Sequence, residues 1–167
     1  MKLYHGSYTI VTKPQAESGR KMVDFGQGFY LTNIQVQAEN WSRVISIRKG
    51  PSATPTISVF EFDYNDVIIA SFRVKIFSEY DMEWLEYVVD CRRGGKMQQE
   101  YDIIEGGVAN DNVIDTVEDY ENGRITAAQA LGQLKYKKVN HQICFRNQKA
   151  IEALLTFVSS YQIPIER

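Results

Sequence analysis

The sequence has few cysteines and no long apolar run, and each absence excludes a class of protein. Cys91 and Cys144 are the only cysteines, and both lie in or beside apolar segments, which favours buried thiols over a disulfide. Their spacing from the two histidines does not fit a zinc site, so no metal is expected. No window approaches a membrane span, and no charged segment leads into an apolar stretch at the N-terminus. We therefore expect a cytoplasmic protein with no membrane partner.

The sequence also lacks an excess of basic charge. Its 19 Lys and Arg residues and 21 Asp and Glu residues give a formal net charge of −2. Nucleic-acid binding needs a basic surface, so a protein partner is favoured over nucleic acid. With 167 residues, of which 44% are hydrophobic and 12% aromatic, the chain fits one folded domain over residues 1–167.

Apolar periodicity divides the chain into strands and helices without a regular βαβ order. Strands are predicted at residues 2–5, 25–32, 56–63, 67–72, 101–104 and 141–145. A first helix is predicted between Asn33, as its cap, and Gly50. Further helices are predicted at residues 79–91, 113–120 and 126–136, and after Asn147 as far as Val158. This mixture predicts an α+β fold with mainly antiparallel strands.

Three short segments each place a polar or aromatic functional group among strand-like residues. They are residues 3–7 (Leu-Tyr-His-Gly-Ser), 26–32 (Gly-Gln-Gly-Phe-Tyr-Leu-Thr) and 141–145 (His-Gln-Ile-Cys-Phe). The second segment is not a P-loop, because no Gly-Lys-Ser/Thr follows it, and it is not a Rossmann fingerprint. The first two segments each have an ordinary alternative, namely a hydrogen-bonded histidine at His5 and a core tyrosine at Tyr30.

The order and residue patterns of these segments resemble the three signature segments of ADP-ribosyltransferases of the diphtheria toxin and poly(ADP-ribose) polymerase type. The chain is also similar to a functionally uncharacterised bacterial group that shares Tyr-His-Gly-Ser, Asp-Phe-Gly-x-Gly-Phe-Tyr-Leu-Thr and Asn-x-Gln-Ile-x-Phe. The resemblance covers most of the chain. It implies an ADP-ribosyltransferase-like split antiparallel β core with flanking helices, and a cleft for NAD between two sheets.

The resemblance assigns His5, Tyr30 and Gln142 to the three catalytic positions. His5 would contact the adenosine ribose of NAD. The backbone of Gly6 would hold the nicotinamide carboxamide, since a residue without a Cβ lets a flat ligand approach closely. Tyr30 would lie against the nicotinamide ring. NAD is then the substrate, and no metal takes part.

Further NAD-binding positions follow from the same resemblance. Trp41, eleven residues after Tyr30, matches an aromatic residue that stacks on the nicotinamide ring, although it also fits the apolar stripe of its helix. The carboxamide-binding serine of the family falls at an alanine here, and Gln37 is a possible substitute. Ser7 and Gly28, inside the first two segments, complete the predicted set.

Gln142 stands where the resembling family has its catalytic glutamate. A carboxylate there stabilises the oxocarbenium-like ribose and can deprotonate the attacking group. Glutamine accepts a hydrogen bond from a ribose hydroxyl but has no charge and cannot act as a base. The exchange could cost about 2–4 kcal/mol at the transition state.

Other charged residues could assist, and for each an ordinary role is favoured. Asp24 and Glu105 could lie near the cleft, but a solvated surface carboxylate is the more common state. Arg92 and Arg93 could bind the pyrophosphate of NAD, but arginines near a helix C-terminus often interact with the helix dipole.

The predicted reaction is mono-ADP-ribosyl transfer from NAD to a macromolecule, because polymer synthesis in the family goes with the missing glutamate. One role compatible with this activity is the toxin of a bacterial toxin–antitoxin pair, silenced by a small neutralising partner protein. The alternative is a binding module for NAD or ADP-ribose that acts through protein interaction without turnover. Gln142 is the residue that favours this alternative.

Overall fold

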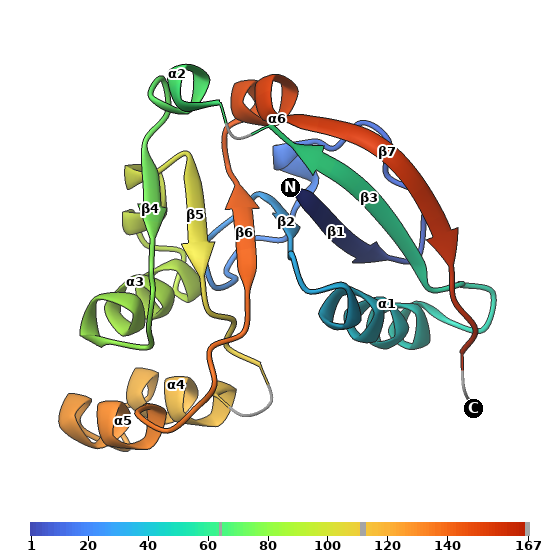
Figure 1. Ribbon diagram of the computed structural model, residues 1–167. Helices are drawn as coiled ribbons and strands as arrows, with labels where there is room; N and C mark the ends of the chain where they lie inside the picture. Colours follow the sequence, from blue (N-terminus) through green and yellow to red (C-terminus); the bar gives the residue numbers. More distant parts are fainter. Residues whose placement is uncertain (64, 111–112, 166–167) are drawn as a thin grey trace.

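Two β-sheets form the centre of the fold (Figure 1). The computed structural model describes residues 1–63, 65–110 and 113–165. One sheet contains, in spatial order, the antiparallel strands β1 (Lys2–Ser7), β3 (Thr56–Phe62) and β7 (Leu155–Gln162). The other contains β2 (Phe29–Leu31), β6 (Gln142–Phe145), β5 (Ile103–Gly106) and β4 (Val74–Ile76). Only β4 and β5 pair in parallel among these described strands.

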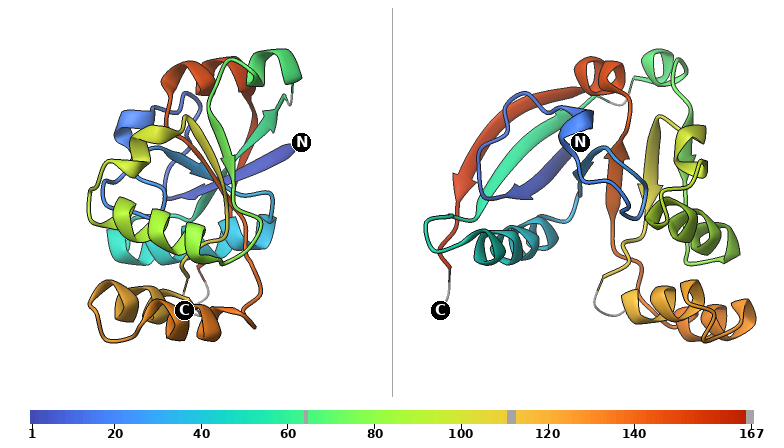
Figure 2. Two further views of the ribbon diagram at one scale, coloured as in Figure 1. Left: turned by 90° about the vertical axis from the view of Figure 1, so that its left-hand side faces the viewer. Right: turned by 180° about the vertical axis from the view of Figure 1, so that it is seen from behind.

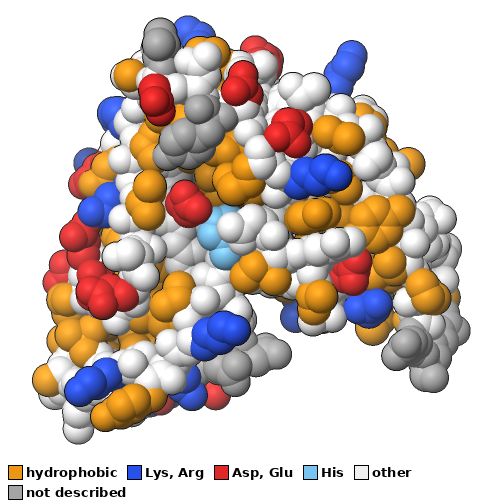
Figure 3. Space-filling view, in the orientation of Figure 1, with side chains coloured by type: hydrophobic (Ala, Val, Ile, Leu, Met, Phe, Trp, Pro, Cys, Tyr) orange, Lys and Arg blue, Asp and Glu red, His pale blue; other side chains and the backbone are white. Residues whose placement is uncertain are grey.

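Six α-helices surround the two sheets in the described part of the chain (Figures 1 and 2). α1 (Gln35–Lys49) packs on β1, and α3 (Met82–Arg92) covers one face of the four-stranded sheet. α4 (Ile114–Glu121) and α5 (Ala127–Leu134) form a pair beside α3, whereas α2 (Asp66–Ile69) and α6 (Gln148–Leu154) lie at the opposite end. The surface is notched between the α4–α5 pair and α1 (Figure 3).

Two groups of buried side chains hold these layers together. The larger group lies between α3 and the four-stranded sheet, and it includes Trp84 and Tyr87 of α3 and Ile104 of β5. The second group joins the two sheets, and in it the rings of Phe62 and Phe145 meet edge to face at 5.6 Å. Burying side chains of this size contributes about 1.5–3 kcal/mol each, so this contact fixes how the two sheets pack.

The α+β class and the mainly antiparallel pairing are confirmed. Of the predicted strands, those at residues 2–5, 25–32, 56–63, 101–104 and 141–145 correspond to β1, β2, β3, β5 and β6. Two predicted helix boundaries also hold. The Asn147 side chain accepts a hydrogen bond from Lys149 N (2.9 Å) at the start of α6, and Gly50, with φ of 133°, ends α1.

Three predictions of local structure are wrong. Residues 67–72 are not a strand, because Asn65 Oδ1 accepts from Ile68 N and starts the short helix α2. The last helix does not reach Val158, because residues 155–162 form β7 and pair with the free edge of β3. Asn33 does not cap α1, whose N-cap residue is Ile34; the Thr32 hydroxyl accepts from Ile34 N instead.

Both cysteines are buried and free, as predicted. Burial raises the pKa of the Cys91 and Cys144 thiols to about 12. Within the residues that the structure describes, no helix is long and apolar enough to cross a membrane.

Candidate functional site

The two sheets separate immediately after a short contact between β1 and β2. Tyr4 N donates to Thr32 O (2.8 Å) and Thr32 N donates to Tyr4 O (3.0 Å), which forms an isolated bridge. If this antiparallel pairing continued, Gly6 would face Tyr30. No backbone hydrogen bond joins these two residues in the described chain. We call this open end between Gly6 and Tyr30 the seam.

His5 lies at the seam and fills part of it. Its Nδ1 is 2.6 Å from Tyr30 O, and a carbonyl oxygen can only accept, so Nδ1 carries the hydrogen. The ring lies 4.4 Å from that of Phe29. Burial lowers the pKa of His5 below its usual 6.5, which keeps the imidazole neutral. Nε2 is then an acceptor, and it has no hydrogen-bond partner among the described residues.

Gly6 is required for the contact between β1 and α1. A Cβ at this position would overlap the backbone carbonyl of Ala38 in α1. Because Tyr4 directs its N–H and C=O toward β2, alternation along the strand directs those of Gly6 toward the seam as well. The glycine therefore both brings the helix close and places a donor and an acceptor at the open edge.

Tyr30 is held mainly by the loop that precedes it. Its hydroxyl donates to Gly26 O (2.6 Å) and accepts from Phe25 N (3.0 Å), and the Phe25 ring stacks on it at 6.5 Å. Burial raises the pKa of this phenol well above 10, with a smaller contribution from Cys144 and Asp24. The hydroxyl is therefore a structural group in this conformation.

Gln142 projects from the same sheet face as Tyr30, because Cys144 lies opposite Tyr30 and two residues after Gln142. It is only 8% exposed. Its Nε2 donates to Asp24 Oδ2 (3.3 Å) and to Gly107 O (3.1 Å). Asp24, expected at the surface, is thus a buried partner of Gln142.

Trp41 is a surface residue and not a core residue, with 39% of its area exposed. The guanidinium groups of Arg20 and Arg48 lie over its ring, at 5.5 and 5.8 Å from the centroid. Such contacts are each worth about 0.5–1 kcal/mol at exposed sites. The indole ring predicted to stack on the nicotinamide therefore already contacts two guanidinium groups.

The remaining predicted NAD-binding residues have structural contacts. Gln37 Nε2 donates to His141 O (2.7 Å) and its Oε1 accepts from His141 N (3.3 Å), so its amide ties α1 to the residue before β6. Gly28 packs closely on β6, since a Cβ there would overlap Cys144 Sγ. Ser7 is half-buried at the end of β1, opposite Thr56. A carboxamide at Gln37 would have to displace the His141 backbone.

Arg92 is surrounded by carboxylates. Its guanidinium lies 3.3 Å from Asp24, 3.6 Å from Glu118 and 3.8 Å from Glu121. Arg93 also pairs with Glu121, at 3.8 Å. A pyrophosphate would meet negative charge here, so these arginines do not form an anion site in this arrangement.

The other acidic candidate, Glu105, pairs with His141. The Glu105 carboxylate accepts from His141 Nε2 (2.8 Å), and His141 Nδ1 accepts from Asn33 N (3.0 Å). This places a hydrogen in the neutral ring on Nε2. Sequence reasoning missed this pair, although a strand-end Glu and a strand-start His were both visible. It ties β5 and β6 to the entry of α1.

The structure therefore joins the predicted residues in two pairs. His5 meets the backbone of Tyr30 at the seam, and Gln142 shares a sheet face with the Tyr30 ring. Phe29 and Tyr30 point to opposite sides of β2, so the His5 ring and the Tyr30 ring lie on different sides of that strand. An NAD molecule contacting all three would have to cross the seam.

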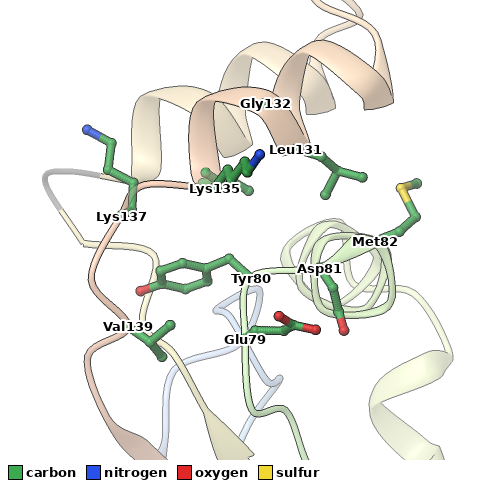
Figure 4. A pocket seen from close by; sticks show the side chains of 10 residues that line it. Glu79, Tyr80, Asp81, Met82, Leu131, Gly132, Lys135, Lys137 and Val139 are labelled. Carbon is green, nitrogen blue, oxygen red and sulfur yellow. The ribbon is translucent and has the colours of Figure 1, made fainter.

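A cavity of about 430 Å³ lies between the start of α3 and the end of α5 (Figure 4). None of the predicted NAD-binding residues lines it. One of its walls is Tyr80, whose hydroxyl donates to Val108 O (2.8 Å). The neighbouring Gly107 carbonyl holds Gln142, so the cavity and the Gln142 side chain share one supporting loop.

Comparisons with known proteins identify a family whose description names no activity. The chain matches no curated protein and no solved structure. Residues 1–157 match a family described as a protein of unknown function (DUF3990). Since this match covers nearly the whole chain, including the seam, Gln142 and the start of β7, the chain belongs to the DUF3990 family.

Proposed function

We propose that the chain is an NAD-dependent mono-ADP-ribosyltransferase that modifies a macromolecular acceptor. The observation that carries the proposal is the seam, where β1 and β2 diverge and leave His5 Nε2 and the Gly6 backbone without a partner strand. The resemblance to ADP-ribosyltransferases assigns ribose and carboxamide binding to these same two residues. The split of the β core into two sheets agrees with that assignment.

In this reaction the bond between nicotinamide and ribose breaks, and its electron pair leaves with the nicotinamide. Gly6 N–H and C=O hold the carboxamide, and His5 Nε2 accepts a hydrogen bond from a hydroxyl of the adenosine ribose. The other ribose, from which the nicotinamide leaves, becomes oxocarbenium-like and is captured by a nucleophile of the acceptor, whose proton passes to solvent. Gln142 offers a dipole in place of a negative charge, so a strong nucleophile on the acceptor is expected.

The exposed, cation-binding ring of Trp41 supports the proposal. The nicotinamide ring of NAD is cationic, and the Trp41 face already binds the Arg20 guanidinium. Binding would exchange one cation for another, at little net cost in cation–π energy. This exchange would also move the loop of residues 19–28, which carries Arg20 and precedes Tyr30.

The test follows nicotinamide release and transfer of labelled ADP-ribose in bacterial lysate. His5→Phe keeps a ring beside Phe29 but removes both nitrogens, whereas His5→Asn keeps a donor and an acceptor. We expect His5→Phe to lose activity by about 100-fold and His5→Asn to retain more. Tyr136→Ala, at an 85% exposed residue outside the seam, is the control. Equal activity in wild type and His5→Phe would refute the proposal.

A second candidate function is a binding module for NAD or ADP-ribose. Gln142 favours it, because a neutral amide replaces the catalytic carboxylate and is held in a buried network. Saturable NAD binding with neither labelled protein nor free nicotinamide would identify the module. His5→Phe should weaken that binding as well, so the role of the seam is tested in both cases.

A toxin role is the physiological form of the proposal that we favour. It predicts growth arrest when the chain is expressed without a neutralising partner. Arrest that disappears with His5→Phe would support an enzymatic toxin. Arrest that persists would mean that the protein acts through another surface.

A further inference from the structure

The amide of Gln142 has only one chemically sensible orientation. The two groups near its nitrogen are the Asp24 carboxylate and the Gly107 carbonyl, and both are acceptors. Turning the amide over would put its oxygen against two other oxygens and lose both hydrogen bonds. The nitrogen therefore faces inward, and the carbonyl oxygen Oε1 occupies the other end.

Oε1 of Gln142 is free to accept a hydrogen bond. No described residue donates to it. In the described chain, the fully buried side-chain nitrogen and oxygen atoms without a hydrogen-bond partner are Ser46 Oγ, Tyr87 Oη and Arg92 Nε, so Oε1 keeps contact with solvent. The small exposed part of this otherwise buried side chain thus includes a hydrogen-bond acceptor on the same sheet face as Tyr30.

Asp24 is well placed to hold this orientation. Its Oδ2 accepts from Ala109 N (2.9 Å) and from Gln142, while Oδ1 lies 3.3 Å from Arg92 Nη1. These contacts come from the loop after β5, from β6 and from α3, so the carboxylate is fixed from three directions. Burial raises the pKa of Asp24, although the Ala109 N–H and the Arg92 charge act in the opposite direction.

We propose that Asp24 is a positioning residue that holds Gln142 with Oε1 outward, as the acceptor for a ribose hydroxyl of NAD. The inference rests on the proposed NAD chemistry and deepens it. The chain keeps a carboxylate at this site but places it behind the Gln142 side chain. Its negative charge polarises the Gln142 amide, which strengthens the acceptor that faces the ribose.

A double-mutant cycle on nicotinamide release tests whether Asp24 acts through Gln142. Asp24→Asn should lower kcat by about 10- to 100-fold and leave KM for NAD within about twofold. In a Gln142→Ala background the same substitution should change kcat by less than about twofold. Equal effects in both backgrounds, or no effect of Asp24→Asn on kcat, would overturn the inference.

Glu121→Gln is the matched control. It also converts a carboxylate beside Arg92 into an amide, but no contact joins Glu121 to Gln142 in the described structure. We expect wild-type kcat in this variant. If Glu121→Gln slows the reaction as much as Asp24→Asn, the effect runs through Arg92 and the positioning role is wrong.

A second measurement uses only folded wild-type protein. The side-chain amide resonances of Gln142, assigned by their loss in Gln142→Ala, should titrate with a carboxyl group whose pKa lies above 3.8. They should also shift on addition of NAD. Resonances whose chemical shifts do not change as the carboxyl group titrates would refute the contact with Asp24. If the resonances titrate, but NAD does not shift them and no nicotinamide is released, the proposed function fails and the Asp24–Gln142 contact stands.

Discussion

Two glycine-to-alanine substitutions should change stability in opposite directions. At Gly6 an added Cβ would overlap the backbone carbonyl of Ala38, which cannot swing away as a side chain could. At Gly132, inside α5, an added Cβ meets nothing within 4 Å. The chemical change is the same at both sites, so the difference between them reports the packing of α1 against β1.

The expected magnitudes follow from these surroundings. Forcing a methyl group into a packed site costs about 1–3 kcal/mol, and a rigid backbone neighbour favours the upper end. Replacing glycine by alanine returns about 0.5–1 kcal/mol in backbone entropy, so Gly6→Ala should lose about 2 kcal/mol in total. Gly132→Ala should gain about 0.5–1 kcal/mol.

Thermal unfolding followed by circular dichroism is the assay. For a domain of this size each kcal/mol moves Tm by about 2–4 °C. Gly6→Ala should therefore lower Tm by about 4–8 °C, and Gly132→Ala should raise it by about 1–4 °C. The double variant should show the sum, because the sites share no partner. An unchanged or raised Tm in Gly6→Ala would mean that α1 does not pack on β1 as described.

Three further predictions test other parts of the structure. The pKa of His5 is lower in the folded chain than its usual 6.5. Above pH 6.5 His5 is neutral in both the folded and the unfolded chain, so the contribution of His5 to the unfolding free energy is complete. Below pH 6.5 the unfolded chain binds a proton at His5 more readily than the folded chain does, and this contribution decreases. The unfolding free energy of wild type should therefore fall relative to His5→Phe below this pH in urea titrations, and a constant difference would contradict the lowered pKa. Cys91 and Cys144 should resist a thiol reagent at about pH 8 until urea unfolds the chain, because both thiols are buried with pKa about 12; rapid labelling of native protein would disprove this burial. Gln142→Glu should not speed nicotinamide release, because the new carboxyl faces Asp24 and the Gly107 carbonyl and retains a proton; a faster enzyme would show that these oxygens move apart.

The sequence predicted those elements whose signals are local. The Asn147 cap and the alternation in residues 56–63 act within a few residues, and both predictions hold. The prediction that the last helix continues to Val158 was wrong because Leu154 and Leu155 fit an apolar helix face as well as the start of a strand. Pairing with β3, about a hundred residues earlier, decides between the two, and no local pattern reports it.

The candidate site shows the same limit. His5, Gly6 and Tyr30 were selected from short segments, and the structure brings His5 to the Tyr30 backbone across 25 residues of sequence. Asp24 was expected at the surface because an isolated aspartate carries no signal of burial. Its partners Arg92, Ala109 and Gln142 come from three distant elements, so only the folded chain reveals the network.

The seam indicates that β1 and β2 diverge for a reason other than stability. Extending their ladder by one more pair would join Gly6 to Tyr30, and each hydrogen bond so formed contributes about 0.5–1.5 kcal/mol. The chain instead places the His5 imidazole on the Tyr30 carbonyl. A phenylalanine at this position would pack on Phe29 equally well but leave that carbonyl unpaired, and a serine could reach it but not fill the space. Histidine satisfies the carbonyl, packs as a ring and keeps a second nitrogen as an acceptor. A side chain with this combination is expected where the opened strand edge meets a ligand rich in hydroxyl groups.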